Sequence, residues 1–79
     1  MIKTFKILTY SDSKWSGGGV YSNVNYLQEM DVSINEFIKE TGLKISSISH
    51  SLVNENIQVG TAEFNTQRNI YLYSTVFFT

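Results

Sequence analysis

The segment RNIYLYSTVFFT, residues Arg68 to Thr79, decides how the chain must fold. Its β-branched and aromatic composition predicts a β-strand. One face of that strand carries Ile70, Leu72, Val76 and Phe78, and the other carries Tyr71, Tyr73 and Phe77. A strand that is apolar on both faces is usually central in its sheet and covered on both sides. We therefore expect this segment to be a central strand.

Two further segments are predicted to pair with it. Ile2 to Tyr10 is rich in β-branched and aromatic residues, which predicts a strand. The turn-forming residues that follow it are expected to end this strand. Leu43 to Val53 predicts another strand, whose apolar phase shifts by one residue near Ser46-Ser47, as a β-bulge would require. Asn54 to Gln67 is polar, and it fits either a short extra hairpin turning at Gly60-Thr61 or an open loop.

The clearest helix lies in NYLQEMDVSINEFIKETG, residues Asn25 to Gly42. Apolar side chains recur at helical spacing at Leu27, Met30, Ile34, Phe37 and Ile38. A capping box fits at Asn25 with Gln28 and again at Ser33 with Glu36. The pattern therefore leaves two possible starts of the helix, about two turns apart. Gly42 is expected to end the helix in the left-handed conformation.

The order strand, loop, helix, strand, strand predicts an α+β fold in a single domain, residues 1–79. One helix would pack on a mostly antiparallel sheet of three or four strands, a β-α-β-β arrangement. One helix covers only one face of such a sheet. The other face, with its tyrosines, is expected to be hidden by a second copy of the chain or by a ligand, and this is the main argument for a homodimer or higher oligomer.

Composition excludes several classes of protein. There is no cysteine and only one histidine, His50, which argues against disulfides and a closed zinc site, and no metal or cofactor is predicted. The net charge is −1 with six basic residues spread along the chain, unlike the clustered footprint of a nucleic-acid binder. No apolar segment approaches the roughly 20 residues of a membrane span, and no signal-like segment is visible. We expect a cytoplasmic protein.

Enzymatic activity is not expected. Nucleophilic catalysis needs a nucleophile beside a base that a third group holds in place. His50 is the only imidazole, and its neighbours Ser49 and Ser51 point to the opposite face of a strand. The carboxylates show no spacing typical of metal ligation or acid–base catalysis.

The segment SKWSGGGVYS, Ser13 to Ser22, is the candidate ligand site. It matches neither the P-loop nor the dinucleotide-binding motif. Consecutive glycines can nevertheless form amide concavities that hold anions, and aromatic rings can stack on a base. The predicted ligand-binding residues are Lys14, Trp15, Gly17, Gly18, Gly19, Tyr21 and Arg68, with Arg68 included if the terminal strand lines the same cleft. The alternative is an ordinary turn with Trp15 folded back onto the core.

Two stretches also suggest a family. INEFIKE (Ile34 to Glu40) and KISSISHS (Lys44 to Ser51), with the terminal apolar strand, resemble a family of very small sporulation-associated bacterial and phage proteins. The resemblance covers Ile2 to Leu8 and Leu27 to Thr79 and implies a strand-helix-strand-strand unit. It implies no activity and no catalytic residue.

Two functions are therefore carried forward. In the first, a small oligomeric protein sequesters an anionic, nucleotide-like molecule through the glycine-rich segment and its aromatic residues, in the manner of phage proteins that absorb host defence signals. In the second, the aromatic strand face and Trp15 dock on a larger protein and inhibit it.

Overall fold

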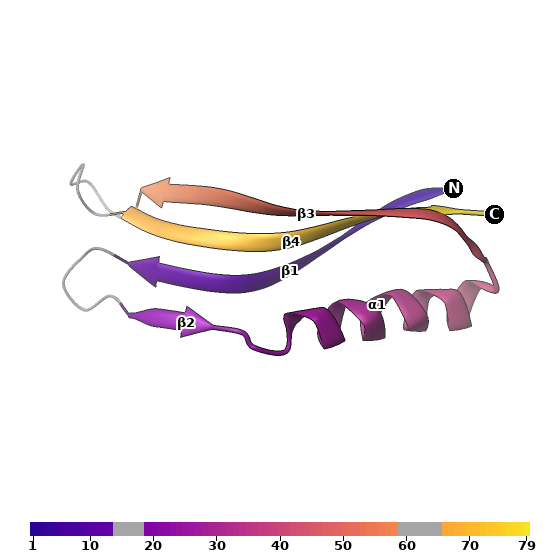
Figure 1. The fold of residues 1–79 in the computed structure, drawn as a ribbon, viewed down its shortest axis with the longest axis horizontal. Coiled ribbons are helices and arrows are strands. Elements are labelled where there is room, and N and C mark those ends of the chain that lie inside the picture. The colour runs from indigo at the N-terminus through magenta and orange to yellow at the C-terminus, as the bar shows by residue number, and fades with distance from the viewer. Residues whose placement is uncertain (14–18, 59–65) are drawn as a thin grey trace.

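The structure, a computed structural model, describes residues 1–13, 19–58 and 66–79. It contains one helix and four strands over these residues (Figure 1). The elements are β1 (Ile2–Ser13), β2 (Val20–Ser22), α1 (Tyr26–Thr41), β3 (Ile45–Gln58) and β4 (Thr66–Phe78). The strands form one antiparallel sheet in the order β2-β1-β4-β3. The predicted α+β fold, with one helix on a small antiparallel sheet, is confirmed.

Strand β4 is central, as its two apolar faces predicted. It pairs with β1 on one side and with β3 on the other, so that Ser74 lies opposite both Phe5 and His50. Directly opposed residues share a face, and successive residues alternate between faces. The even-numbered residues of β4 therefore lie on the helix side of the sheet, and the odd-numbered residues lie on the other side.

The core lies between α1 and the helix side of β1 and β4. Its buried members are Phe5, Met30, Ile34, Leu72, Val76 and Phe78. The Phe37 ring packs edge-on against Phe5 at 6.0 Å and tilted against Phe78 at 5.0 Å between centroids. Leu27 was predicted to be on the buried face of the helix, but its side chain is 62% exposed. In the first helical turn Tyr26, not Leu27, packs against the core.

The C-terminal end of α1 agrees with the prediction, and its N-terminal end differs. Gly42 ends the helix with φ of 72° and donates its N–H to the Ile38 carbonyl (2.8 Å), as expected. Asn25 is the N-cap residue, but its side chain makes no capping hydrogen bond, so the predicted capping box does not form. Asn23 instead makes side-chain hydrogen bonds at the start of the helix. Its side chain accepts from the Asn25 N–H (3.1 Å) and donates to the Glu29 carboxylate (2.7 Å).

The strands are longer than predicted. The register between β3 and β4 shifts between Ile45 and Ser47, which confirms the predicted bulge. Strand β3 then continues to Gln58, opposite Thr66, so much of the polar Asn54–Gln67 region forms the arms of the β3–β4 hairpin. The turn predicted at Gly60-Thr61 falls outside the described residues. The three-residue strand β2 was not predicted.

The helix is much shorter than the sheet that it packs on. Sixteen residues rise about 24 Å at 1.5 Å per residue, whereas the molecule measures 47 × 21 × 18 Å. Figure 1 shows α1 beside the half of the sheet that holds both termini. We call the opposite half the loop end; it comprises residues 10–13, 54–58 and 66–70, next to segments 14–18 and 59–65.

The packing predicts how two helix substitutions differ. Met30 is 1% exposed in the core, so Met30→Ala should lower the free energy of unfolding by about 2–5 kcal/mol through lost burial and a residual cavity. Leu27→Ala removes an exposed side chain from the same helix and should change it by no more than about 0.5 kcal/mol. Urea unfolding of the two variants measures this, and equal losses would contradict the helix orientation.

Candidate functional site

A hollow at the loop end collects polar side chains from β3 and β4. Asn54, Asn56, Thr66 and Arg68 line a volume of about 240 Å³. Asn54 lies opposite Ile70 and Asn56 lies opposite Arg68, which places the hollow on the helix side of the sheet. We call it the loop-end hollow. Its amides, hydroxyl and guanidinium together supply both hydrogen-bond donors and acceptors.

Among the residues that the structure describes, Arg68 is the only cation that lines the loop-end hollow. Its Nη2 lies 2.9 Å from Asp12 Oδ2, and its guanidinium carbon lies 5.4 Å from the centre of the Tyr10 ring. Tyr10 also donates its hydroxyl to Asp12 Oδ2 at 2.9 Å. The pKa of Arg68 is raised, first by hydrogen bonding with Tyr10 and then by the charge of Asp12. The guanidinium is thus held in place and charged, while its side chain stays 44% exposed.

The structure brings the root of the glycine-rich segment to the same end of the sheet as Arg68. Ser13 lies opposite Gln67, and its N–H donates to the Gly19 carbonyl at 3.2 Å. Lys14, Trp15, Gly17 and Gly18 were predicted to bind the ligand and lie outside the described residues. A Cβ added at Gly19 would meet no atom within 4 Å, so no close backbone approach requires glycine there.

The register separates two of the predicted site residues. Arg68 lies opposite Asp12, whereas Tyr21 lies opposite Ser11, the next residue along β1. Successive strand residues point to opposite faces, so Arg68 and Tyr21 lie on opposite sides of the sheet. Tyr21 is half exposed on its side.

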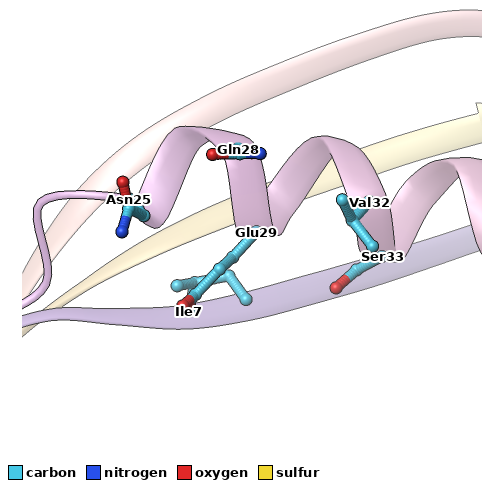
Figure 2. A pocket seen from close by; sticks show the side chains of 6 residues that line it. All are labelled: Ile7, Asn25, Gln28, Glu29, Val32 and Ser33. Atoms are coloured by element: carbon cyan, nitrogen blue, oxygen red, sulfur yellow. The ribbon is translucent and has the colours of Figure 1, made fainter.

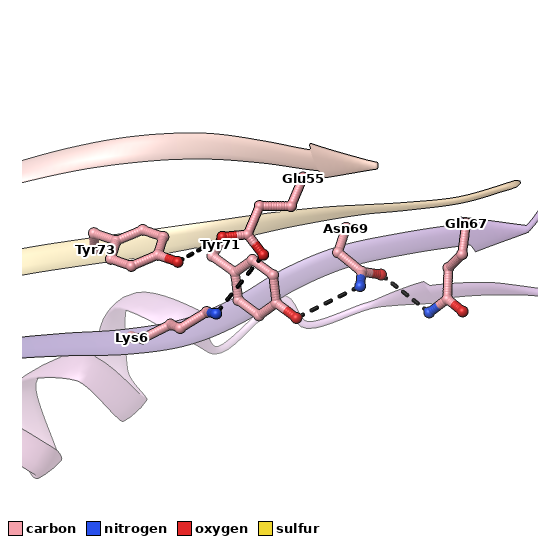
Figure 3. Close-up of polar contacts among 6 residues, drawn as sticks. All are labelled: Lys6, Glu55, Gln67, Asn69, Tyr71 and Tyr73. Carbon is pink, nitrogen blue, oxygen red and sulfur yellow. Dashed lines mark hydrogen bonds and ion pairs between the residues drawn. The ribbon is translucent and has the colours of Figure 1, made fainter. Parts of the chain in front are cut away.

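We call the side of the sheet opposite the helix the tyrosine face. It carries a network of aromatic and charged side chains (Figure 3). Tyr73 donates its hydroxyl to Glu55 at 2.7 Å, and the Lys6 ammonium lies 3.7 Å from the same carboxylate. Lys6 also lies 4.0 Å from the centre of the Tyr71 ring, a cation–π contact. The pKa of Lys6 is raised, first by hydrogen bonding with Tyr73 and then by the charge of Glu55. The tyrosines are therefore only partly exposed within one chain.

A second network on the same face connects β1 to β4. Ser11 donates to Asn69 Oδ1 at 2.6 Å, and Gln67 donates to both Ser11 Oγ (3.0 Å) and Asn69 Oδ1 (3.1 Å). Asn69 in turn lies 3.5 Å from the Tyr71 hydroxyl (Figure 3). Asn69 and Ser11 are buried, so each bond satisfies a polar group that has lost water.

His50 has a partner that sequence reasoning missed. Its Nδ1 shares a hydrogen bond of 2.6 Å with Ser74 Oγ on β4, while Ser49 and Ser51 lie on the other face, as expected. Ser74 is fully buried, and no carboxylate among the described residues hydrogen-bonds His50. A buried hydroxyl without an orienting acid beside its histidine does not form the arrangement that nucleophilic catalysis uses. The pair fixes β3 against β4.

A second hollow, larger than the loop-end hollow, lies between β1 and the first half of α1. It has a volume of about 490 Å³ and is lined by Ile7, Asn25, Gln28, Glu29, Val32 and Ser33. Figure 2 shows Glu29 and Ser33 reaching from the helix toward β1. The described residues that line it include a carboxylate and no cation, so it is less suited to an anion than the loop-end hollow.

Comparisons with protein-family models, curated proteins and solved structures found no match to this chain. The resemblance to small sporulation-associated proteins therefore stays a prediction. Within residues 1–13, 19–58 and 66–79, no group of three or more metal-ligating side chains comes together. The one described helix is neither long nor apolar enough to cross a membrane.

The Ser11–Asn69 network predicts a stability effect. Asn69→Ala leaves the buried Ser11 hydroxyl without its acceptor and should lower the free energy of unfolding by about 1–3 kcal/mol. The exposed Asn56→Ala should be nearly neutral. In a double-mutant cycle by urea unfolding, Ser11→Ala combined with Asn69→Ala should cost less than the sum of the single variants. Strict additivity would show that the two side chains are not coupled.

Proposed function

We propose that the protein is a non-enzymatic module that binds an anionic, nucleotide-like small molecule at the loop end of its sheet. The observation that carries the proposal is the half-exposed guanidinium of Arg68, held beside the amides of Asn54 and Asn56 in a polar hollow. The glycine-rich segment begins and ends at the same end of the sheet. Its amides and Trp15 would complete the site.

Different residues would bind different parts of the ligand. Arg68 would bind a phosphate oxygen, because a charged guanidinium donates in the fixed geometry that phosphate prefers. Asn54 and Asn56 would hydrogen-bond the polar edge of a base or a ribose. The hollow's 240 Å³ is smaller than the roughly 300–1,000 Å³ of sites for drug-sized ligands. It would therefore hold part of a nucleotide, and the glycine-rich segment would hold the rest.

The biological form of this proposal is sequestration. A protein without catalytic groups lowers the free concentration of a signal by holding it, in proportion to its own abundance. Such a role would place it in the cytoplasm, where nucleotide signals are made, and matches the strategy of phage proteins that absorb defence signals.

Substitutions at the loop end test the ligand proposal. Arg68→Ala should weaken nucleotide binding about tenfold or more, because one hydrogen bond to a charged group is worth about 1.5–3 kcal/mol. Asp12→Asn should strengthen binding, since it removes the carboxylate that competes for Arg68. Lys39→Ala removes an exposed cation from the far end of α1 and serves as the control for net charge.

Native mass spectrometry with mixed linear and cyclic nucleotides gives the readout, and tryptophan fluorescence reports whether Trp15 is involved. Discrete ligand masses on the wild type that Arg68→Ala loses and Lys39→Ala keeps would support the proposal. A wild type that binds no nucleotide at millimolar concentration would overturn it.

The tyrosine face favours a second function, docking on and inhibiting a larger protein. No described helix or strand covers this face, and partly exposed tyrosines are frequent anchors in protein interfaces. Under this alternative, a protein partner recovered from the native host should be lost from a folded Tyr73→Ala variant and kept by Arg68→Ala. Under the nucleotide proposal, ligand binding should be lost from Arg68→Ala and kept by Tyr73→Ala. The two variants therefore separate the two functions.

A further inference from the structure

The edge strand β3 lacks the features that normally protect a sheet edge. From Ile45 to Asn54 it carries no lysine, arginine, aspartate or glutamate, and the chain has no proline. Its side chains are exposed on both faces, with Leu52 61% and Ile48 40% exposed. Natural proteins usually blunt such edges with lysine, proline, bulges or covering elements. The bulge at Ser46 leaves the following residues as a regular open edge.

The opposite edge of the sheet is protected. Strand β2 covers residues 10–12 of β1, and the remainder of β1 carries Lys3 and Lys6. Helix α1 also packs against β1 (Figure 1). The long unprotected edge is therefore β3, and a partner that pairs with it would satisfy backbone groups as well as cover apolar side chains.

Backbone hydrogen bonds show which β3 residues face outward. The N–H of Phe78 donates to the carbonyl of Met1, which precedes β1, and that of Thr79 donates to the carbonyl of Lys44, which precedes β3. Along β4 the even-numbered residues thus direct their N–H groups to β1. His50 lies opposite Ser74, so its own N–H and C=O point away from β4. The same holds for Ile48 and Leu52, opposite Val76 and Leu72.

One antiparallel register makes this edge complementary to itself. If two copies pair about an axis through His50, Ile48 lies opposite Leu52 of the partner subunit, and Ser49 lies opposite Ser51 of the partner subunit. The outward-facing residues then form hydrogen-bonded pairs, each exchanging two bonds. A centre at Ser49 or Ser51 would pair an apolar side chain with His50, and a centre at Leu52 would pair Ile48 with an asparagine.

We infer that the protein forms a homodimer through β3, paired antiparallel over residues 47–53 and centred on His50. The two sheets join into one of eight strands, with both helices on the same face. The Nδ1 bond to Ser74 holds each imidazole against its own β4 and leaves the strand edge free. Pairing stops at the Ser46 bulge, where the alternation of faces changes. This interface does not depend on the ligand proposed above.

Matched charge substitutions test the interface. Ile48→Glu and Leu52→Lys each place a charge opposite an apolar residue and should raise the dimer dissociation constant about tenfold or more. The double variant should restore it to near the wild-type value, since the new carboxylate at position 48 then faces the new ammonium at position 52 of the other copy. Leu27→Lys is the control, because Leu27 is as exposed as Leu52 and lies on α1.

Sedimentation equilibrium on the full chain measures the constants, with circular dichroism to confirm that each variant is folded. A wild type that stays monomeric at all concentrations would overturn the inference. So would equal effects of Leu52→Lys and Leu27→Lys, or a double variant that is not restored.

A cross-link tests the register without disturbing the fold. The chain has no cysteine, and Ser49 and Ser51 are exposed. Opposed side chains lie about 4.5–5.5 Å apart between Cβ atoms, close enough for a disulfide after small adjustment. An oxidised mixture of Ser49→Cys and Ser51→Cys should give mainly the mixed dimer. A purely statistical mixture of cross-linked products, or none, would contradict pairing about His50.

Discussion

A 16-residue helix of about 24 Å packs on a sheet that runs the length of a 47 Å molecule. The different chemistry of the two halves of the sheet follows from that mismatch. Where α1 lies, the helix side of the sheet is apolar and buries Leu72, Val76 and Phe78. Where α1 is absent, burial cannot supply the same stabilisation, because apolar side chains there would face water. The sequence changes accordingly, and Arg68, Asn56 and Asp12 stand on the helix side where apolar residues would otherwise continue.

Hydrogen bonds and charge pairing connect the strands at the loop end. Asn69 and Ser11 are buried and bonded on the tyrosine face, while Arg68 and Asp12 pair on the helix side. The ion pair is open to water on its Arg68 side, and such surface pairs contribute little stability by themselves, at most about 1 kcal/mol. The buried amide and hydroxyl contribute more, because leaving either unpaired costs about 1–3 kcal/mol. The groups that stabilise the loop end least, Arg68 and the exposed asparagines of β3, are therefore those most available to a ligand.

The sequence predicted the features that depend on periodicity and local backbone chemistry. The two apolar faces of β4, the bulge near Ser46 and the left-handed Gly42 each leave a local signature, and each is confirmed. The three-residue β2 is too short to show any period. The capping box failed because Asn23, outside the motif, supplies the hydrogen bonds at the helix start. Pairings such as His50 with Ser74 depend on strand register, although a lone serine in the buried stripe of β4 signals that some partner must exist. Of the predicted site residues, Arg68 lies at the same end of the sheet as the ends of the glycine-rich segment, whereas Tyr21 lies on the other face.

In strand β3, uncovered side chains and an unpaired strand edge occur in the same element. The helix contacts β1 first, so β3, two strands away, receives little cover, and its described side chains are exposed except the half-buried Glu55. A strand in that position can be protected by charge or can be paired. Here its middle is uncharged and self-complementary, whereas its end beyond Asn54 is polar and lines the loop-end hollow. One strand thus carries two surfaces of different chemistry. A partner strand seated on the first leaves the second open to solvent, so assembly and ligand binding need not compete for the same residues.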